Sequence, residues 1–244
     1  MKENIVAIIQ ARMGSIRLPG KVLMDIEGKP MLWHVINRVK YSKLINKIVI
    51  ATSTNKKDDV IEEFCKSNNI DFYRGSEMDV LDRYYQAAKV FKASLIVRIT
   101  SDCPLIDPEV VDLVIKTHLS SDVDYTSNNI KRTFPRGLDT EVFKLSALEK
   151  AYKEAVAPYQ REHVTVYIYE NPYLFRLNNV KNDKDISYLR WTVDEKADLH
   201  FVREIYKRLN KEDRIFLMRD ILNVLEREPF LIEINKYVKQ KSIK

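Results

Sequence analysis

Residues 5–21, IVAIIQARMGSIRLPGK, decide which fold this chain adopts. The first five of them form a short apolar run of the kind that makes a strand buried on both faces of a sheet. The run stops abruptly, and the loop that follows carries three cations, Arg12, Arg17 and Lys21. A strand that leads directly into a basic loop containing glycine is typical of a phosphate-binding cradle.

The spacing of the glycines separates this loop from two well-known phosphate-binding motifs. Gly14 and Gly20 let the backbone turn tightly and approach a ligand. Five residues separate Gly14 from Gly20, which is too many for a Walker A loop, and Val22 follows Lys21 where that loop needs Ser or Thr. The dinucleotide fingerprint GxGxxG is absent as well. The alternative interpretation is a surface loop whose basic residues are solvated, because such loops are common.

The composition favours a single globular domain that does not bind nucleic acid. The chain has 244 residues, of which 45% are hydrophobic and 31% charged, and this length suits one large α/β domain. The net charge is +6, but the basic residues are spread along the sequence among 35 acidic ones. A nucleic-acid-binding protein more often concentrates basic residues in one patch with interleaved aromatics.

Neither a membrane segment nor a leader is expected from the sequence. No apolar run approaches the length of a membrane span, and the first residues lack a signal-peptide pattern. The two cysteines, Cys65 and Cys103, provide no disulfide framework. These features predict no membrane association and a cytoplasmic location.

Apolar runs alternate with amphipathic segments as far as about residue 120, and the pattern then becomes irregular. This alternation predicts an α/β fold, with a mostly parallel Rossmann-like sheet, helices on both of its faces and a small irregular lobe. Ligands of such folds bind outside the carboxyl ends of the strands. Strands are expected at residues 5–9, 47–52, 71–73, 95–100, 141–143 and 188–193 and from Tyr125. Helices are expected after Pro30, Asp58 or Asp59, Asp79 and Pro108 and over residues 146–157 and 216–228.

Two aspartates stand directly after predicted strands. Asp102 follows the strand at 95–100, and Asp194 follows the one at 188–193. Because the carboxyl ends of parallel strands meet at one edge of a sheet, the two carboxylates can lie together beside the basic loop. The alternative is that each is a turn or cap residue, which is how most aspartates in such places behave. Asp198 is expected to cap the helix that follows.

The irregular region offers further polar candidates. Arg136 and Asp139 could form an ion pair within a loop, and such a pair would contribute little to stability. Arg161 and Thr165 lie four residues apart on one face of a predicted helix, and His163 lies on another face, where it could contact a substrate or pack internally. The four histidines are scattered, so no zinc site is expected.

Several long blocks resemble one enzyme family. QARMGSIRLPGKVLMDIEGKPML at residues 10–32, ITSDCPLIDP at 99–108, REHVT at 161–165 and SYLRWTVDEKADL at 187–199 occur in the order found in cytidylyltransferases that activate sugars. The resemblance is to the branch called spore coat polysaccharide biosynthesis protein F. The chain is also similar to CMP-sugar synthetases for 3-deoxy-manno-octulosonate and, more distantly, for acylneuraminate.

The resemblance implies a nucleotidyltransferase fold of the GT-A type and transfer of CMP from CTP to a sugar acid, with release of pyrophosphate, in surface polysaccharide or glycan biosynthesis. It implies Mg²⁺ bound by Asp102 and Asp194, and catalytic roles for Arg12, Lys21 and these two aspartates. The implied nucleotide-binding residues are Gln10, Ala11, Arg12, Gly14, Ser15, Arg17, Lys21, Ser53, Arg83 and Asp102. The implied residues for the acceptor sugar are Arg136, Asp139, Glu141, Arg161 and His163.

The resemblance also implies an organisation within the single domain, 1–244. Residues 1–120 would form the nucleotide half, residues 121–185 an acceptor-sugar and dimerisation lobe, and residues 186–244 the metal-binding strand and C-terminal helices. A homodimer is expected, with contacts through the lobe, where Tyr159, Tyr167 and Tyr169 would offer an aromatic surface.

Three alternatives stay open at the level of sequence. One is a nucleotide-sugar-dependent glycosyltransferase, since Asp122 and Asp124 match the DxD pattern of that class, although they follow a predicted helix end and not a buried strand. Another is a nucleotidyltransferase that uses a different NTP or a non-sugar acceptor. The third is a nucleotide-binding module without catalysis, which the presence of both Asp102 and Asp194 disfavours.

Overall fold

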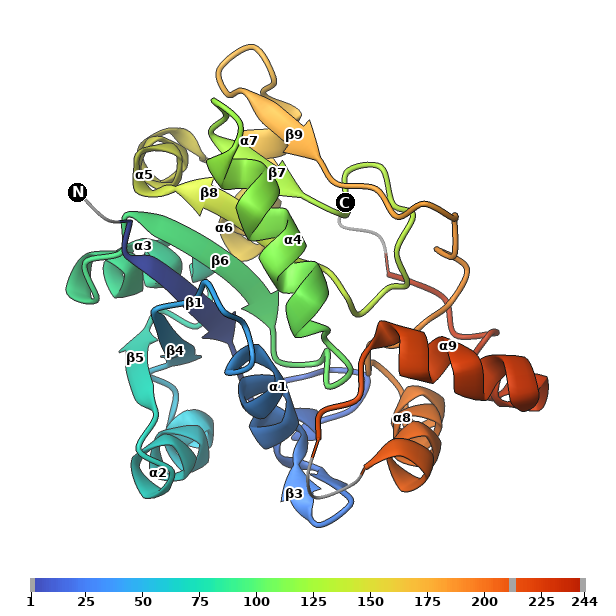
Figure 1. Cartoon of the computed structure of the whole chain (residues 1–244). Coiled ribbons are helices and arrows are strands. Elements are labelled where there is room, and N and C mark those ends of the chain that lie inside the picture. The colour runs from blue at the N-terminus through green and yellow to red at the C-terminus, as the bar shows by residue number, and fades with distance from the viewer. Residues whose placement is uncertain (1–2, 211–213, 242–244) are drawn as a thin grey trace.

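The computed structural model describes residues 3–210 and 214–241. Within them, seven strands form one sheet in the order β5-β4-β1-β6-β8-β7-β9, and Figure 1 shows β1 near its centre. All strands run in one direction except β8, which is antiparallel to both of its neighbours. The strands are β1 (Ile5–Gln10), β4 (Lys47–Ser53), β5 (Asp71–Gly75), β6 (Leu95–Thr100), β7 (Tyr125–Ser127), β8 (Glu141–Lys144) and β9 (Leu177–Asn179). The predicted α/β class with a mostly parallel sheet is therefore confirmed.

Helices cover both faces of the sheet, as the alternation predicted. On β1, Ile5, Ala7 and Ile9 point into one buried cluster and Val6 and Ile8 into another, so the strand is buried on both sides. The first cluster is completed by α1 (Met31–Val39), α2 (Asp59–Ser67), α4 (Pro108–Leu119), α8 (Lys196–Leu209) and α9 (Met218–Arg227), and the second by α3 (Val80–Val90), α5 (Leu145–Glu154) and α7 (Val166–Glu170). Figure 1 shows α4 lying in front of the sheet and α8 and α9 packed side by side.

Short elements connect this framework. They are the 3-10 turns η1 (Lys21–Leu23), η2 (Lys56–Asp58) and η3 (Pro229–Ile234), the hairpin strands β2 (Asp25–Ile26) and β3 (Lys29–Pro30), and the helix α6 (Pro158–Glu162). No helix in the two described ranges is long and apolar enough to cross a membrane.

Two of the predicted helix starts have the expected chemistry. The Asp79 carboxylate accepts a hydrogen bond from the Asp82 amide at the start of α3. Pro108 occupies the first turn of α4, where its missing amide costs nothing. The Asp58 side chain, in contrast, makes no capping hydrogen bond to α2, and its carboxylate is used elsewhere.

The strand predicted at residues 188–193 is wrong. In this segment only Arg190 makes a β-bridge, to Arg136. The Arg136 amide donates to the Leu189 carbonyl at 3.0 Å, and the Trp191 amide donates to the Arg136 carbonyl at 2.6 Å. The apolar side chains of the segment, Leu189, Trp191 and Val193, are buried in the first cluster although the segment does not enter the sheet.

Gly137 permits this docking. Its φ is +111°, and a Cβ built on it would lie 2.6 Å from the backbone nitrogen of Thr192. A side chain would be strained by that φ and would also collide with the neighbouring backbone. The close approach of the two loops therefore depends on glycine.

The helix expected across residues 161–165 is also interrupted. Helices α6 and α7 are separate, and between them Val164 has a φ of +59°, which is unusual for a β-branched residue. The Thr165 amide donates to the His163 carbonyl at 2.6 Å across this tight turn. As a result Arg161 and Thr165 do not share a helix face.

Candidate active site

The carboxyl edge of the sheet brings the basic loop and both aspartates together. Lys21, at the start of η1, donates through Nζ to Asp102 Oδ2 at 2.8 Å and to Asp194 Oδ1 at 3.1 Å. The same ammonium donates to the carbonyl oxygen of Val193 at 2.6 Å. The sequence predicted that the two carboxylates could meet, and they meet on Lys21.

The charged groups of this cluster keep one another ionised. Burial lowers the pKa of the Lys21 ammonium, but the Asp102 and Asp194 carboxylates outweigh burial and the net pKa is raised. Burial raises the pKa of Asp102, and Lys21 outweighs this effect, so the pKa of Asp102 is lowered. Both groups are therefore charged at neutral pH.

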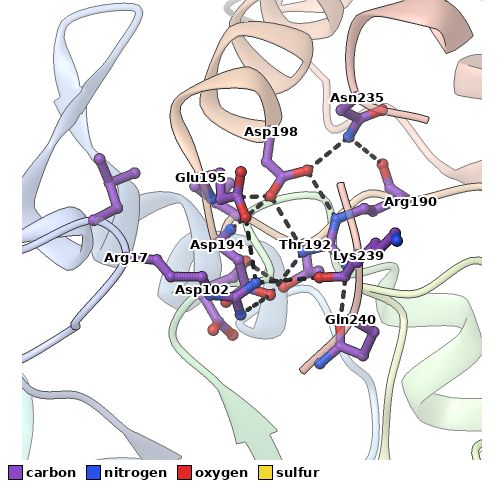
Figure 2. Close-up of polar contacts among 12 residues, drawn as sticks. Arg17, Asp102, Arg190, Thr192, Asp194, Glu195, Asp198, Asn235, Lys239 and Gln240 are labelled. Atoms are coloured by element: carbon purple, nitrogen blue, oxygen red, sulfur yellow. Dashed lines mark hydrogen bonds and ion pairs between the residues drawn. The ribbon is translucent and has the colours of Figure 1, made fainter. Parts of the chain in front are cut away.

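Asp194 receives two further cations, as Figure 2 shows. Its Oδ2 lies 2.9 Å from the Arg17 guanidinium and 2.7 Å from that of Arg190. The second carboxylate that pairs with Arg190 is that of Asp198, which is fully buried and lies 2.9 Å from Arg190 Nε. Asp198 also accepts from the Glu195 amide in a capping box at the start of α8, so its predicted capping role is confirmed.

Residues near the C-terminal end of the described chain close one side of this cluster (Figure 2). Asn235 donates to Asp198 Oδ1 at 2.9 Å and to the Arg190 carbonyl at 3.0 Å. Arg190 donates to Gln240 Oε1 at 2.9 Å, and Arg17 donates to the Lys239 carbonyl at 3.4 Å. No pattern in the sequence predicts this contact, because it joins segments that are far apart in the chain and have no shared motif.

The pair of aspartates has the chemistry of a magnesium site. Mg²⁺ prefers oxygen ligands, keeps several waters and needs few protein carboxylates. Asp102 and Asp194 present two carboxylates to one point at which a cation, the Lys21 ammonium, already lies. No group of three or more His, Cys, Asp or Glu side chains with a metal-binding arrangement occurs in the described ranges. Asp102 and Asp194 could hold the ion.

The loop itself is held by a buried carboxylate that sequence reasoning missed. Asp58 Oδ1 accepts from the Met13 amide at 2.7 Å, and its Oδ2 accepts from the Ser53 hydroxyl. Ser53, predicted to contact the nucleotide, is fully buried and makes this contact instead. The only signal in the sequence was the pair Asp58-Asp59, where either residue could be the helix cap.

The other predicted nucleotide residues surround the same edge. Gly20 has a φ of +72° and needs the freedom of glycine, whereas Ser15 accepts from the Leu18 amide at 3.4 Å and Ala11 is buried. Gly14 adopts no such backbone conformation. Within the described residues Arg12 makes a single ion pair, with Glu162 at 3.4 Å. This exposed pair contributes little to stability, so the guanidinium is available to a ligand.

Arg83 is the most unusual of the predicted nucleotide residues. Its side chain is only 1% exposed and donates to the Ser76 carbonyl at 2.8 Å, yet it has no carboxylate partner in the described ranges. Burial lowers the pKa of its guanidinium. The guanidinium of Arg83 is thus buried at the edge of the cradle without a counter-ion in the described ranges.

The structure leaves the side chain of Arg136, one of the residues predicted to bind the acceptor sugar, without a partner in the described ranges. Its half-buried guanidinium makes no side-chain hydrogen bond or ion pair within residues 3–210 and 214–241. Burial lowers the pKa of Arg136, and the nearby cations Arg132 and Arg190 lower it further. The ion pair considered between Arg136 and Asp139 is wrong, since Asp139 pairs with Arg132 at 2.8 Å.

Two other residues predicted to bind the acceptor sugar are engaged within the protein. Arg161 donates to Asp79 at 2.5–3.1 Å and to the Tyr152 carbonyl at 2.7 Å. Glu141 is 3% exposed, and its carboxylate is surrounded by internal donors. Neither geometry gives the residue a direct contact with a ligand. His163 stays half-buried and makes no side-chain hydrogen bond in the described ranges.

The DxD pair lies at the opposite edge of the sheet. Asp122 and Asp124 precede β7, which runs parallel to β6, so they stand at the amino ends of the strands. Both carboxylates contact Arg176, and Asp124 accepts from its amide at 2.9 Å. They are remote from the basic loop and cannot act with it.

The fold and the site together define a nucleotidyltransferase: a mostly parallel sheet with a basic loop after its first strand and two aspartates beside it. The chain matches the sequence model of the family described as Cytidylyltransferase over residues 6–241. It therefore belongs to the cytidylyltransferase family.

Individual relatives agree with this assignment. The chain is 34% identical over 233 residues to the spore coat polysaccharide biosynthesis protein SpsF of Bacillus subtilis, covering 93% of this chain and 95% of that protein. It is 36% identical over 116 residues to a 3-deoxy-manno-octulosonate cytidylyltransferase of Pelobacter propionicus, covering 46% of this chain and 44% of that one. A solved cytidylyltransferase from Leptospira borgpetersenii superimposes with a TM-score of 0.90 at 34% identity, covering 99% of this chain and 100% of that chain.

Proposed function

We propose that this enzyme transfers CMP from CTP to a sugar acid and releases pyrophosphate, as a step in making a surface polysaccharide or glycan. The observation that carries the proposal is the convergence of Lys21, Asp102 and Asp194 beside the basic loop. The names of the relatives support the choice of nucleotide and acceptor, since they include a 3-deoxy-manno-octulosonate cytidylyltransferase and a protein of polysaccharide biosynthesis.

To catalyse this reaction the protein mainly has to position the two substrates and neutralise the charge of the phosphates. A hydroxyl oxygen of the acceptor attacks the α-phosphorus, its proton passes to solvent, and the bond to pyrophosphate breaks. Arg12, Arg17 and Lys21 would hold the triphosphate and stabilise the departing pyrophosphate. Mg²⁺, held by Asp102 and Asp194, would neutralise phosphate charge and lower the pKa of the attacking hydroxyl.

Binding of a nucleotide would change the ion pairs that the cations of the basic loop make in this structure. Arg17 and Lys21 both pair with Asp194. Triphosphate oxygens are stronger competitors for these cations than a single carboxylate, so binding of CTP would draw the two side chains towards the phosphates. Asp102 would then lose its pair with Lys21, and Asp194 would keep Arg190 as its remaining cation, which leaves an oxygen of each carboxylate for the metal ion.

For the acceptor, we propose that Arg136 binds the carboxylate of the sugar acid. A guanidinium without an internal partner, next to Asp194, can form two parallel hydrogen bonds to a carboxylate. The glycosyltransferase alternative lacks such support, because Asp122 and Asp124 lie at the wrong edge of the sheet.

A homodimer and a cytoplasmic location are part of the proposal. Cys65 and Cys103 are both free and buried, which fits a reducing compartment. The tyrosines expected at the dimer contact give weaker support, because Tyr167 and Tyr169 are partly buried against the second cluster, the one that contains Val6 and Ile8. Light scattering that shows a monomer at assay concentration would remove the dimer from the proposal.

A pyrophosphate-release assay tests the function directly. The enzyme is given each of the four common NTPs with 3-deoxy-manno-octulosonate, N-acetylneuraminate or a neutral sugar, with Mg²⁺ and after its removal with EDTA. Release is expected only with CTP, a sugar acid and Mg²⁺. Equal release with a neutral sugar, or release from another NTP but not from CTP, would contradict the proposal.

A further inference from the structure

A buried polar chain runs beneath the acceptor side of the site. Arg98 lies on β6, opposite Glu141 on β8, and its guanidinium pairs with the Glu141 carboxylate. A second nitrogen of Arg98 donates to Gln10 Oε1 at 3.2 Å. Its third nitrogen, Nε, is buried and has no partner in the described ranges. Arg98 therefore has only two acceptors, Glu141 and Gln10.

Glu141 is fixed from its other side. Its Oε1 accepts from the Tyr125 hydroxyl at 2.5 Å and from the Thr165 hydroxyl at 2.7 Å. Burial raises the pKa of Glu141, but the charge of Arg98 outweighs it, so the pKa is lowered and the carboxylate stays ionised. Rotation of this ionised carboxylate would break its hydrogen bonds to three donors. Glu141 therefore keeps one orientation and holds Arg98 in one orientation as well.

This arrangement determines which way the Gln10 amide faces. An arginine can only donate, so the Gln10 group next to it must be the carbonyl oxygen. If the amide flipped, two donors would face each other and a second nitrogen of Arg98 would lose its acceptor. The Gln10 Nε2 is consequently directed away from Arg98, and its two N–H groups have no hydrogen bond in the described ranges.

The side chain of Gln10 belongs to the acceptor side by its position in the sheet. At the end of β1 it reaches towards β6 and, beyond it, β8 of the lobe, whereas Ser53, predicted to contact the nucleotide, lies on β4, on the other side of β1. The residues that fix Arg98 come from the lobe between 121 and 185. The turn that places Thr165 on Glu141 also holds His163, whose pKa is lowered by burial and by the neighbouring charge of Arg98.

We propose that Gln10 donates a hydrogen bond to an oxygen of the acceptor sugar acid, and not to the nucleotide, with Arg98 and Glu141 as positioning residues for its amide. The inference rests on the proposed function. It replaces the nucleotide contact that the sequence resemblance implied for Gln10, and it adds Arg98, which the sequence did not single out.

Kinetics with Gln10→Glu provide the first test. The variant keeps the shape and an acceptor for Arg98 but removes both N–H donors. With the sugar acid that wild-type enzyme turns over, we expect KM for that acid to rise at least tenfold, while the Kd of CTP by calorimetry stays within about threefold. A loss of CTP affinity with an unchanged acceptor KM would overturn the inference. If wild-type enzyme uses no sugar acid, the proposed function fails instead.

A spectroscopic test does not need turnover. With ¹⁵N-glutamine labelling, the Gln10 side-chain NH₂ signals are assigned by their loss in Gln10→Glu and followed in EDTA, first with CTP and then with 3-deoxy-manno-octulosonate or N-acetylneuraminate. They should move with a sugar acid and not with CTP. Gln86, whose amide donates to Asp82 at 3.0 Å, provides a control signal that should not move. Signals that respond to CTP alone, or to neither ligand, would overturn the inference.

The positioning role of Glu141 is tested with Thr165→Val, since Glu141→Gln would leave Arg98 buried without its counter-ion and could prevent folding. Removing the Thr165 donor loosens Glu141 without deleting charge. We expect about a threefold rise in acceptor KM, an unchanged Kd for CTP and a shifted Gln10 NH₂ signal in the free enzyme. An unchanged Gln10 signal would show that the chain does not position the amide.

Discussion

Residues 1–120, the proposed nucleotide half, and residues 121–185, the proposed acceptor lobe, place their candidate functional side chains by different means. In the nucleotide half, Lys21 and Asp102 meet because β1 and β6 are neighbouring parallel strands that end at one edge. In the lobe, Arg136 is placed by a contact between two loops that depends on Gly137. Strand ends converge whatever the loop sequence is, whereas a contact between loops needs particular residues at the point of approach. The two regions should therefore respond differently to mutation.

The largest effect is expected at the edge of the sheet. Asp194→Asn keeps the shape but deletes the charge that faces Lys21, Arg17 and Arg190, and Asp102→Asn does the same for one partner. Turnover should fall by about 10²–10³-fold or more, as when a group that stabilises transition-state charge is lost. Steady-state pyrophosphate release measures this.

The matched control is Asp124→Asn, in the acceptor lobe at the opposite edge. It also deletes a carboxylate paired with an arginine, yet turnover should stay within about twofold of wild type because the exposed pair contributes little. If Asp102→Asn and Asp194→Asn kept near-normal activity, both aspartates would be capping or turn residues, since Asn caps about as well as Asp.

The second effect concerns the loop contact in the lobe. Gly137→Ala should lower the free energy of unfolding by about 2–4 kcal/mol, because alanine is strained at φ +111° and its Cβ meets backbone at 2.6 Å. Urea unfolding measures the change. The control in the nucleotide half is Gly14→Ala, where a Cβ meets only the end of a side chain at 3.4 Å, and stability should change by no more than about 1 kcal/mol. If both variants lost the same free energy of unfolding, the acceptor lobe would not depend on its glycine contact more than the nucleotide half does.

The same distinction explains what the sequence could predict. In an α/β fold an apolar run as short as residues 5–9 forms a buried strand, and the observed strand β1 covers this run and one further residue. Asp102 stands out because it follows a strand end, and Lys21 because it belongs to the basic loop after the first strand. The strand–helix alternation predicts a mostly parallel sheet but not the order of its strands. These inferences need only periodicity and the geometry of parallel sheets.

Elsewhere the physical cause lies in contacts between distant segments. The run at 188–193 is apolar like a strand, and only the docking of the loop around Gly137 shows why it is not one. Arg161 and Glu141 have the chemistry of ligand contacts, but their internal partners, Asp79 and Arg98, are not visible as neighbours in the sequence. Periodicity says nothing of such pairs.

The third effect tests the basic loop by binding. Arg12→Ala should weaken CTP binding by about 1.5–3 kcal/mol, as expected for a lost charged hydrogen bond, and leave stability nearly unchanged because its pair with Glu162 is exposed. Isothermal calorimetry measures the affinity. Arg176→Ala removes the same charge at the amino edge of β7 and should leave CTP affinity unchanged. If the two variants bound CTP alike, the nucleotide would not lie on the loop.

The smallest effect concerns how the loop is held. Asp58 makes no capping bond to α2, so its removal should act on the loop and not on the helix. Asp58→Ala leaves the Met13 amide without its acceptor, and CTP affinity should fall by about 1 kcal/mol. Asp58→Asn should recover most of that loss, because its oxygen can still accept from Met13 while its amide donates to the Ser53 hydroxyl.

The neighbouring Asp59→Ala separates the loop from the helix, since Asp59 pairs with Arg74 at 2.7 Å at a more exposed position. This variant should leave CTP affinity unchanged in calorimetry. If Asp59→Ala weakened CTP binding as much as Asp58→Ala, then α2 would matter and the bond to Met13 would not. If Asp58→Ala alone weakened CTP binding, the nucleotide half would also depend on one contact between distant residues. The two regions would then differ less in how they place their side chains.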